Sequence, residues 1–101
     1  MITYKVETSP EFQKQFYKLD RVLQERVRKI LDSLPFRNWK QDALAGDLKG
    51  FYSHHFEDNH YRIIYTVQDY ILKILAIWVG KRKENFYKDL RNYLKRTKQL
   101  K

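Results

Sequence analysis

Basic residues lie at both ends of one apolar stretch of this chain, residues 61–87. Arg62 stands near its start, and the run Lys81, Arg82 and Lys83 stands near its end. If the stretch folds as two antiparallel strands and a short loop, both ends meet at one end of a sheet. Guanidinium and ammonium groups gathered there would suit the oxygens of a phosphodiester. The spacing therefore predicts an anion-binding site.

Two residues that can carry protons or orient a substrate are expected beside these cations. His55 lies on the preceding predicted strand, and Tyr87 falls in the first turns of the last predicted helix. Such a set can move protons and stabilise the charge of a pentacoordinate phosphate without a metal. RNA supplies its own nucleophile, the 2′-OH. Exposed Arg and Lys at strand ends are also ordinary, so from these residues alone a plain solvated surface stays open.

Other chemistries find little support. The chain has three glycines, none of them in a nucleotide-binding spacing, and it has no cysteine. His54, His55, Glu57 and Asp58 are close in sequence, but adjacent strand residues point to opposite faces. We therefore expect no metal and no cofactor.

Composition narrows the class of protein. The chain has 101 residues, and we expect one domain over residues 1–101. Lys and Arg number 21 against 12 acids, a net charge of +9. This excess predicts a polyanionic partner such as nucleic acid, an acidic protein or a membrane surface. No signal peptide is visible and the longest nearly apolar run, residues 71–79, is too short to span a bilayer, so we expect a cytoplasmic protein.

The first third of the chain predicts a strand and a helical hairpin. Ile2, Tyr4 and Val6 alternate with polar residues, as in a half-buried strand. Ser9 and Asp20 are suitable N-caps for two amphipathic helices, and Pro35 ends the second. After it Trp39 is interpreted as an aromatic plug over the core.

The remainder predicts three strands and a final helix. The strands cover residues 51–56, 61–67 and from 70 or 71 to 79, with a tight turn at Gln68-Asp69, and the helix covers roughly residues 84–94. Ser53 and His55 would share one face of the first of these strands. We predict an α+β fold in which an N-terminal strand and a helical hairpin pack on a mainly antiparallel four-stranded sheet, followed by a C-terminal helix, with the helices on one face.

Three segments together resemble the RelE/ParE superfamily of toxins from type II toxin–antitoxin systems. They are Leu48-Lys49-Gly50, YRIIYTVQDYILKIL from residue 61, and VGKRKENFY from residue 79. With the helical hairpin, the resemblance covers nearly the whole chain. The segment GFYSHHFEDNHYRIIY is similar to the YoeB-type branch, so the resemblance points to a RelE/YoeB-like toxin.

The resemblance implies a metal-independent endoribonuclease that cleaves messenger RNA on the ribosome and is neutralised by an acidic antitoxin. Arg62 would stabilise the scissile phosphate, Arg82 would bind phosphate and protonate the leaving group, and Tyr87 would stack on or orient the nucleotide. RelE has two lysines where this chain has Ser53 and His55, so His55 becomes the expected base. Asp42 lies about where the YoeB branch places a catalytic glutamate, so Asp42 stays open as an alternative general base. RNA contacts are expected from the lysines Lys49, Lys81 and Lys83.

Two other functions remain open. One is a ParE-like inhibitor of DNA gyrase without nuclease activity, although the ParE branch generally lacks the full set of Arg62, Arg82 and Tyr87. The other is a basic module that binds RNA or protein without chemistry.

Overall fold

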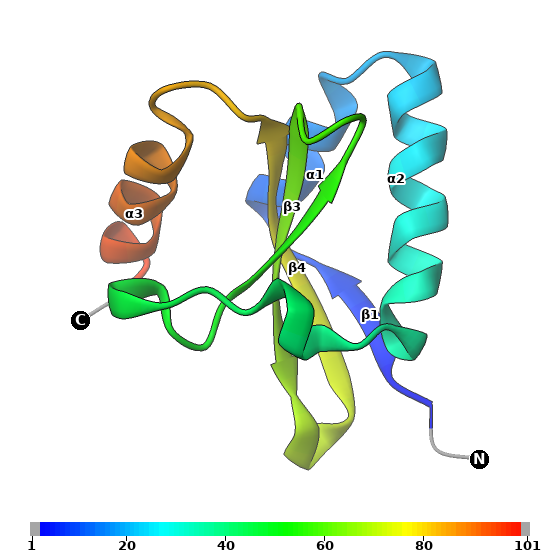
Figure 1. Cartoon of the computed structure of the whole chain (residues 1–101), viewed down its shortest axis with the longest axis vertical. Helices are drawn as coiled ribbons and strands as arrows, with labels where there is room; N and C mark the ends of the chain where they lie inside the picture. The colour runs from blue at the N-terminus through cyan, green and yellow to red at the C-terminus, as the bar shows by residue number, and fades with distance from the viewer. Residues whose placement is uncertain (1–2, 100–101) are drawn as a thin grey trace.

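The computed structural model of the chain describes residues 3–99, and a four-stranded sheet in the order β1-β4-β3-β2 forms its centre (Figure 1). β1 (Lys5–Thr8) runs parallel to β4 (Lys73–Lys81). β3 (Tyr61–Gln68) is antiparallel to β4 and to β2 (Tyr52–Phe56). The predicted mainly antiparallel sheet is confirmed, while Ile2 of the predicted first strand lies outside the described residues.

Three α-helices accompany the sheet in the described part of the chain: α1 (Pro10–Tyr17), α2 (Arg21–Ser33) and α3 (Phe86–Arg96). The predicted caps are confirmed, because Ser9 Oγ accepts from the Phe12 N–H and Asp20 Oδ1 accepts from the Leu23 N–H. Short 3₁₀ turns fill the connections: η1 (Leu34–Phe36), η2 (Trp39–Asp42), η3 (Gly46–Leu48) and η4 (Asp69–Ile71). Because η4 occupies the hairpin turn, β4 begins two or three residues later than predicted.

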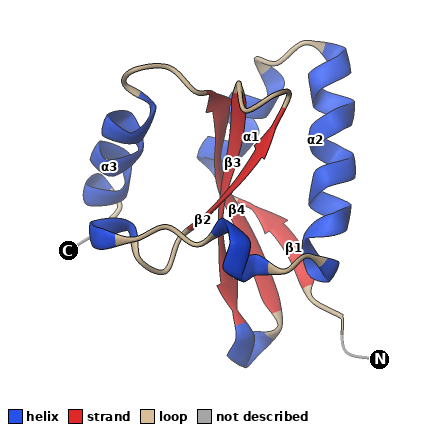
Figure 2. Ribbon diagram, in the orientation of Figure 1, coloured by secondary structure: helices blue, strands red, loops and turns tan. Residues whose placement is uncertain are grey.

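Helices cover both faces of the sheet, which corrects the expectation of a single covered face. Figure 2 shows α2 on one side of the strands and α3 on the other, and Phe12 of α1 packs in the same core as α2. One core holds Ile63 and Tyr65 against α1 and α2, and the second holds Ile64 and Trp78 against α3. The physical reason is visible in the sequence: β3 and β4 contain continuous apolar runs, which are typical of strands buried on both faces.

A β-bulge adjusts β4 to these two cores. Ile64 pairs with Trp78, but the next residue, Tyr65, pairs with Ala76, so Ile77 is an extra residue in β4. Ile77 and Trp78 therefore both pack in the core under α3 although they are neighbours in the chain.

Beyond the end of β1, the side chains of Ser9 (the N-cap of α1) and Gln15 form hydrogen bonds to the backbone of β4. β1 pairs with Lys73–Ala76 only, so the second half of β4 has no strand on that side. Ser9 Oγ donates to the carbonyl of Ile77 (3.1 Å), and Gln15 Oε1 accepts from the Val79 N–H (2.8 Å). These contacts satisfy backbone groups of β4 that would otherwise face the open edge.

We predict that Ser9→Ala lowers the free energy of unfolding by about 2 kcal/mol, because it removes a helix cap and leaves the buried Ile77 carbonyl without its partner. Asp20→Ala is the control: it removes a cap from α2 on the surface and should cost about 1 kcal/mol. Urea unfolding of both variants measures the difference. Equal losses would mean that the Ser9–Ile77 contact adds nothing.

Candidate active site

One row across the sheet brings His55 and Arg62 together. His55 on β2 pairs directly with Arg62 on β3, and Arg62 pairs with Gly80 on β4. Directly paired residues share a face, here the face covered by α3. His55 is exposed, whereas Arg62 is only 8% exposed.

The first turn of α3 places Tyr87 against this row. The guanidinium carbon of Arg62 lies 5.9 Å from the centre of the Tyr87 ring, a cation–π distance. The Tyr87 hydroxyl lies 3.5 Å from Ser53 Oγ, and Ser53 is buried on the same strand face as His55, as predicted. α3 therefore holds Tyr87 between the phosphate-binding arginine predicted from sequence and a buried hydroxyl.

The basic loop after β4 is fixed beside the same end of the sheet. Lys81 pairs with Tyr61, and the Arg82 N–H donates to the carbonyl of His60 (2.7 Å). The side chains of Arg82 and Lys83 remain exposed. The structure thus gathers four of the predicted residues, His55, Arg62, Arg82 and Tyr87, into what we call the sheet-end cluster.

The predicted RNA-binding lysines are not all in this cluster. Lys81 and Lys83 line an adjoining cleft. Lys49 lies just before β2, at the opposite end of that strand from His55. Its predicted contact with RNA stays a prediction, and it would be made at a separate place.

Arg62 has a feature that the sequence did not reveal. Its Nε is buried and has no hydrogen-bond partner among the described residues, and no carboxylate in that part of the chain forms an ion pair with it. A buried N–H that forms no hydrogen bond is costly, so this arginine would gain from an acceptor such as a phosphate oxygen. An arginine within an otherwise apolar central strand was the available signal.

The environment of His55 keeps its imidazole neutral. The pKa of His55 is lowered below its usual 6.5, mainly because the side chain is partly buried and secondly because the positive charge of Arg62 is near. Its neutral form therefore predominates near pH 7 and can accept a proton. His54 points to the other face, where burial and then the charge of Arg37 lower its pKa.

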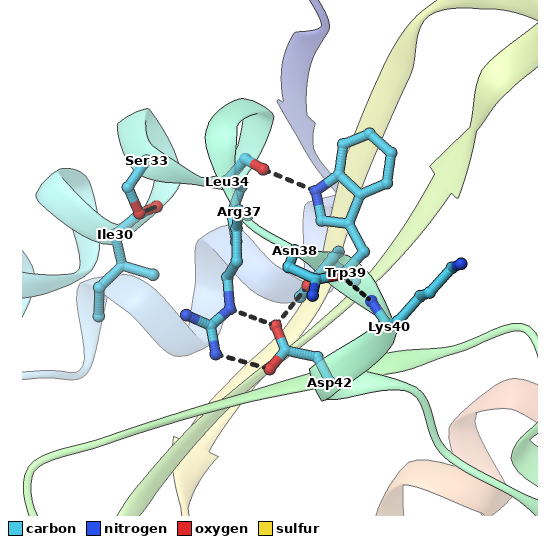
Figure 3. Close-up of polar contacts among 9 residues, drawn as sticks. Ile30, Ser33, Leu34, Arg37, Asn38, Trp39, Lys40 and Asp42 are labelled. Carbon is cyan, nitrogen blue, oxygen red and sulfur yellow. Dashed lines mark hydrogen bonds and ion pairs between the residues drawn. The ribbon is translucent and has the colours of Figure 1, made fainter.

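Asp42, the alternative base, lies across the sheet from Arg62. Its carboxylate accepts from Arg37 Nε (2.5 Å) and Nη2 (2.7 Å), a pairing visible in Figure 3, and from the Tyr65 hydroxyl (2.5 Å). Tyr65 belongs to the core under α1 and α2. Asp42 is 6% exposed, so it is part of a buried polar network that neither its sequence position nor its neighbours indicated.

Trp39 lies in the same 3₁₀ turn as Asp42, and its indole N–H donates to the Leu34 carbonyl (2.7 Å; Figure 3). The ring packs edge-on against Tyr4 and covers the core, so the predicted plug is confirmed. Burial alone would raise the pKa of Asp42, but hydrogen bonds from Arg37 and Tyr65 outweigh it and lower that pKa below 3.8.

A metal-binding group and a membrane-spanning helix are both absent from residues 3–99. Within that range no three His, Cys, Asp or Glu side chains are grouped to hold a metal ion. No helix there has the length and apolar character needed to cross a membrane.

The fold is that of RelE-like toxins. A mutant of the Escherichia coli toxin RelE in the free state matches with a TM-score of 0.74 and 21% identity, covering 91% of this chain and 98% of that one. The toxin–antitoxin complex RelBE2 from Mycobacterium tuberculosis gives 0.69 and 21%, covering 81% and 94%. A conserved hypothetical protein of Helicobacter pylori gives 0.58 and 28%, covering 78% and 94%.

Residues 6–86 match the family described as ParE toxin of type II toxin–antitoxin system, parDE. The chain belongs to this family, and it is a toxin of a toxin–antitoxin system with a RelE-like structure. A comparison with curated proteins found no match.

We predict that Asp42→Asn lowers the free energy of unfolding by about 3 kcal/mol, because it leaves the Arg37 charge without its partner. The lowered pKa also sets a pH dependence. The stabilisation is present above pH 3.8, where Asp42 is ionised even in the unfolded chain, and is lost as the pH falls through the lower folded value. Chemical unfolding between pH 2 and 7 measures both effects.

Asp47→Asn provides the matched control. Asp47 forms an exposed ion pair with Arg91 at 2.9 Å and should contribute at most about 1 kcal/mol. An equal loss in both variants would contradict a structural role for the Asp42 network.

Proposed function

We propose that this toxin is a metal-independent endoribonuclease that cleaves messenger RNA on the ribosome and so arrests translation. The observation that carries the proposal is the pairing of an exposed, neutral His55 with a buried, unpartnered Arg62 under the ring of Tyr87. A base beside an unsatisfied cation is what cleavage of RNA by its own 2′-OH requires.

The proposed reaction assigns one step to each group. Neutral His55 takes the proton of the 2′-OH, and the resulting oxygen attacks the adjacent phosphorus. The P–O5′ bond breaks, which gives a 2′,3′-cyclic phosphate and a free 5′-OH after Arg82 or water supplies a proton. Arg62 donates to the non-bridging oxygens, whose charge increases in the transition state.

Tyr87 positions the substrate in this proposal. Its ring already lies against Arg62 and its hydroxyl is near Ser53, so its orientation is set before RNA binds. An aromatic ring at this place can stack on an unpaired base next to the scissile phosphate.

We also propose an acidic antitoxin as the partner that silences the toxin. The RelBE2 structure is described as a toxin–antitoxin complex, and E. coli RelE is described in complex with a RelB antitoxin peptide. The net charge of +9 suits an acidic partner. With ribosomes as the site of action, we place the toxin in the cytoplasm.

A second candidate, inhibition of DNA gyrase, is favoured by the family match to ParE toxins. The two functions differ in a direct way. A gyrase inhibitor blocks supercoiling and leaves message intact, whereas the nuclease cuts translated message and leaves supercoiling intact.

We predict that purified toxin cuts a translated message and that Arg82→Ala lowers the rate at least about 100-fold, because the group proposed to bind phosphate and to protonate the leaving oxygen is lost. Arg82 is exposed, so the variant should fold normally. Arg96→Ala, in the last turn of α3, removes the same charge away from the cluster and should retain activity. Inhibited supercoiling with uncut message would instead select the gyrase function.

The role of His55 predicts a pH dependence. The base must be unprotonated, so kcat/KM should rise with pH and level off, with a midpoint below 6.5 because the pKa of His55 is lowered. His55→Gln should lower the rate about 100-fold or more and abolish this acid limb.

His54→Gln tests the neighbouring imidazole on the other face of the same strand and should leave the pH profile unchanged. An identical profile in His55→Gln and the unmodified toxin would remove His55 from the mechanism.

A further inference from the structure

A cleft of about 610 Å³ lies beside the sheet-end cluster, along the part of β4 that β1 leaves free. Gln15 of α1 and the two residues that follow this helix, Lys18 and Leu19, form one wall. The loop leading into α3 and the first turn of α3 form the other. The polar residues that line it include Gln15, Lys18, Lys81, Lys83, Asn85 and Asp89. Its volume is in the range of small-molecule sites, which fits a nucleotide.

The basic residues 81–83 lie between this cleft and the sheet-end cluster and contribute side chains to both. Arg82 is anchored toward β3 through its bond to His60, whereas Lys81 and Lys83 line the cleft on the other side of β4. Lys81 and Lys83 flank Arg82 in the chain, so the cleft adjoins the residue proposed to bind phosphate. A nucleotide next to one bound at Arg82 is therefore within reach of the cleft.

Gln15 gives the cleft a defined hydrogen-bonding character. Its Oε1 accepts from the Val79 N–H at 2.8 Å, and this contact fixes which way the amide faces. The NH₂ group of Gln15 has no hydrogen-bond partner among the described residues, so two donors are available in the cleft wall. They are suited to the carbonyl oxygen of a base.

The charge of the cleft also favours a nucleotide. Three lysines, Lys18, Lys81 and Lys83, face two carboxylates, Glu84 and Asp89, and none of these five residues forms an ion pair within residues 3–99. Ammonium groups bind phosphate, while carboxylates accept from exocyclic amines of bases. The mixture suits a nucleotide better than a uniformly acidic peptide.

We propose that this cleft binds the nucleotide next to the scissile phosphate of single-stranded RNA, with Lys18 on its phosphate and Gln15 on its base. The inference rests on the proposed nuclease function and adds a second subsite to it. Neither Lys18 nor Gln15 belongs to the sheet-end cluster, so the subsite can be altered without touching the reacting groups.

The test uses a fluorescent 2′-O-methyl RNA oligomer, which lacks the nucleophile and is not cut. Anisotropy titrations over a range of salt give Kd for the intact toxin, Lys18→Ala and Lys14→Ala. Lys14 is exposed on the same helix but does not line the cleft, so it is a matched control of equal charge.

Lys18→Ala should raise Kd about fivefold and make the dependence of log Kd on log salt shallower by about 0.7, since one phosphate contact is lost. Lys14→Ala should change neither. Equal behaviour of the two variants overturns the subsite. Unchanged RNA affinity with weakened binding of an acidic antitoxin peptide would assign the cleft to protein and also overturn it.

Gln15→Glu tests the contact to the base. The variant keeps an oxygen for the Val79 N–H, so the edge of β4 stays satisfied, but it removes both donors. Across oligomers that differ at the flanking base, it should lose the preference of the intact toxin for one base over another. An unchanged preference overturns the assignment of Gln15.

Cleavage of translated message by the same proteins separates the two proposals. If the intact toxin cuts and Lys18→Ala cuts with the same kcat and KM, the subsite fails and the nuclease stands. If the intact toxin does not cut, while Lys18→Ala alone weakens RNA binding, the nuclease fails and the RNA-binding cleft stands.

Discussion

The pleat of β3 is the constraint on which the structure depends. Ile63 and Ile64 are consecutive residues, so their side chains enter two different cores, one under α1 and α2 and the other under α3. The same alternation places Arg62 on the face with Ile64. A shift of register by one residue would exchange the faces and remove Arg62 from Tyr87 and His55, so the two cores also fix the position of the site.

The charged groups buried on the two faces of the sheet differ in how they are paired. On one face the buried Asp42 carboxylate is fully engaged by Arg37 and Tyr65, an arrangement that stabilises the fold. On the other face Arg62 is buried without a partner, an arrangement that disfavours folding and leaves a cation ready for an anion. The satisfied carboxylate and the arginine without a hydrogen bond therefore lie on opposite faces of the same sheet.

Local sequence signals predicted most of the fold and the placing of Arg62 beside His55. Ser9 and Asp20 were recognisable as caps because capping needs only neighbouring residues, and strand order placed Arg62 beside His55. The expectation of one covered face is wrong, although the continuous apolar runs of β3 and β4 are typical of strands buried on both faces. The Asp42 network and the cleft could not be predicted, since each needs side chains from segments brought together only by the fold, such as Gln15 and Val79.

The parallel pairing of β1 with β4 has a consequence for the order in which the protein is made. Ser9 donates a hydrogen bond to the Ile77 carbonyl, and the two residues are 68 positions apart in the chain. During synthesis the first strand and both early helices leave the ribosome long before their sheet partner exists, so they cannot reach their native packing. The central sheet can form only after β4 has been synthesised, so Arg62 and its neighbours come together later than the first strand and the early helices emerge.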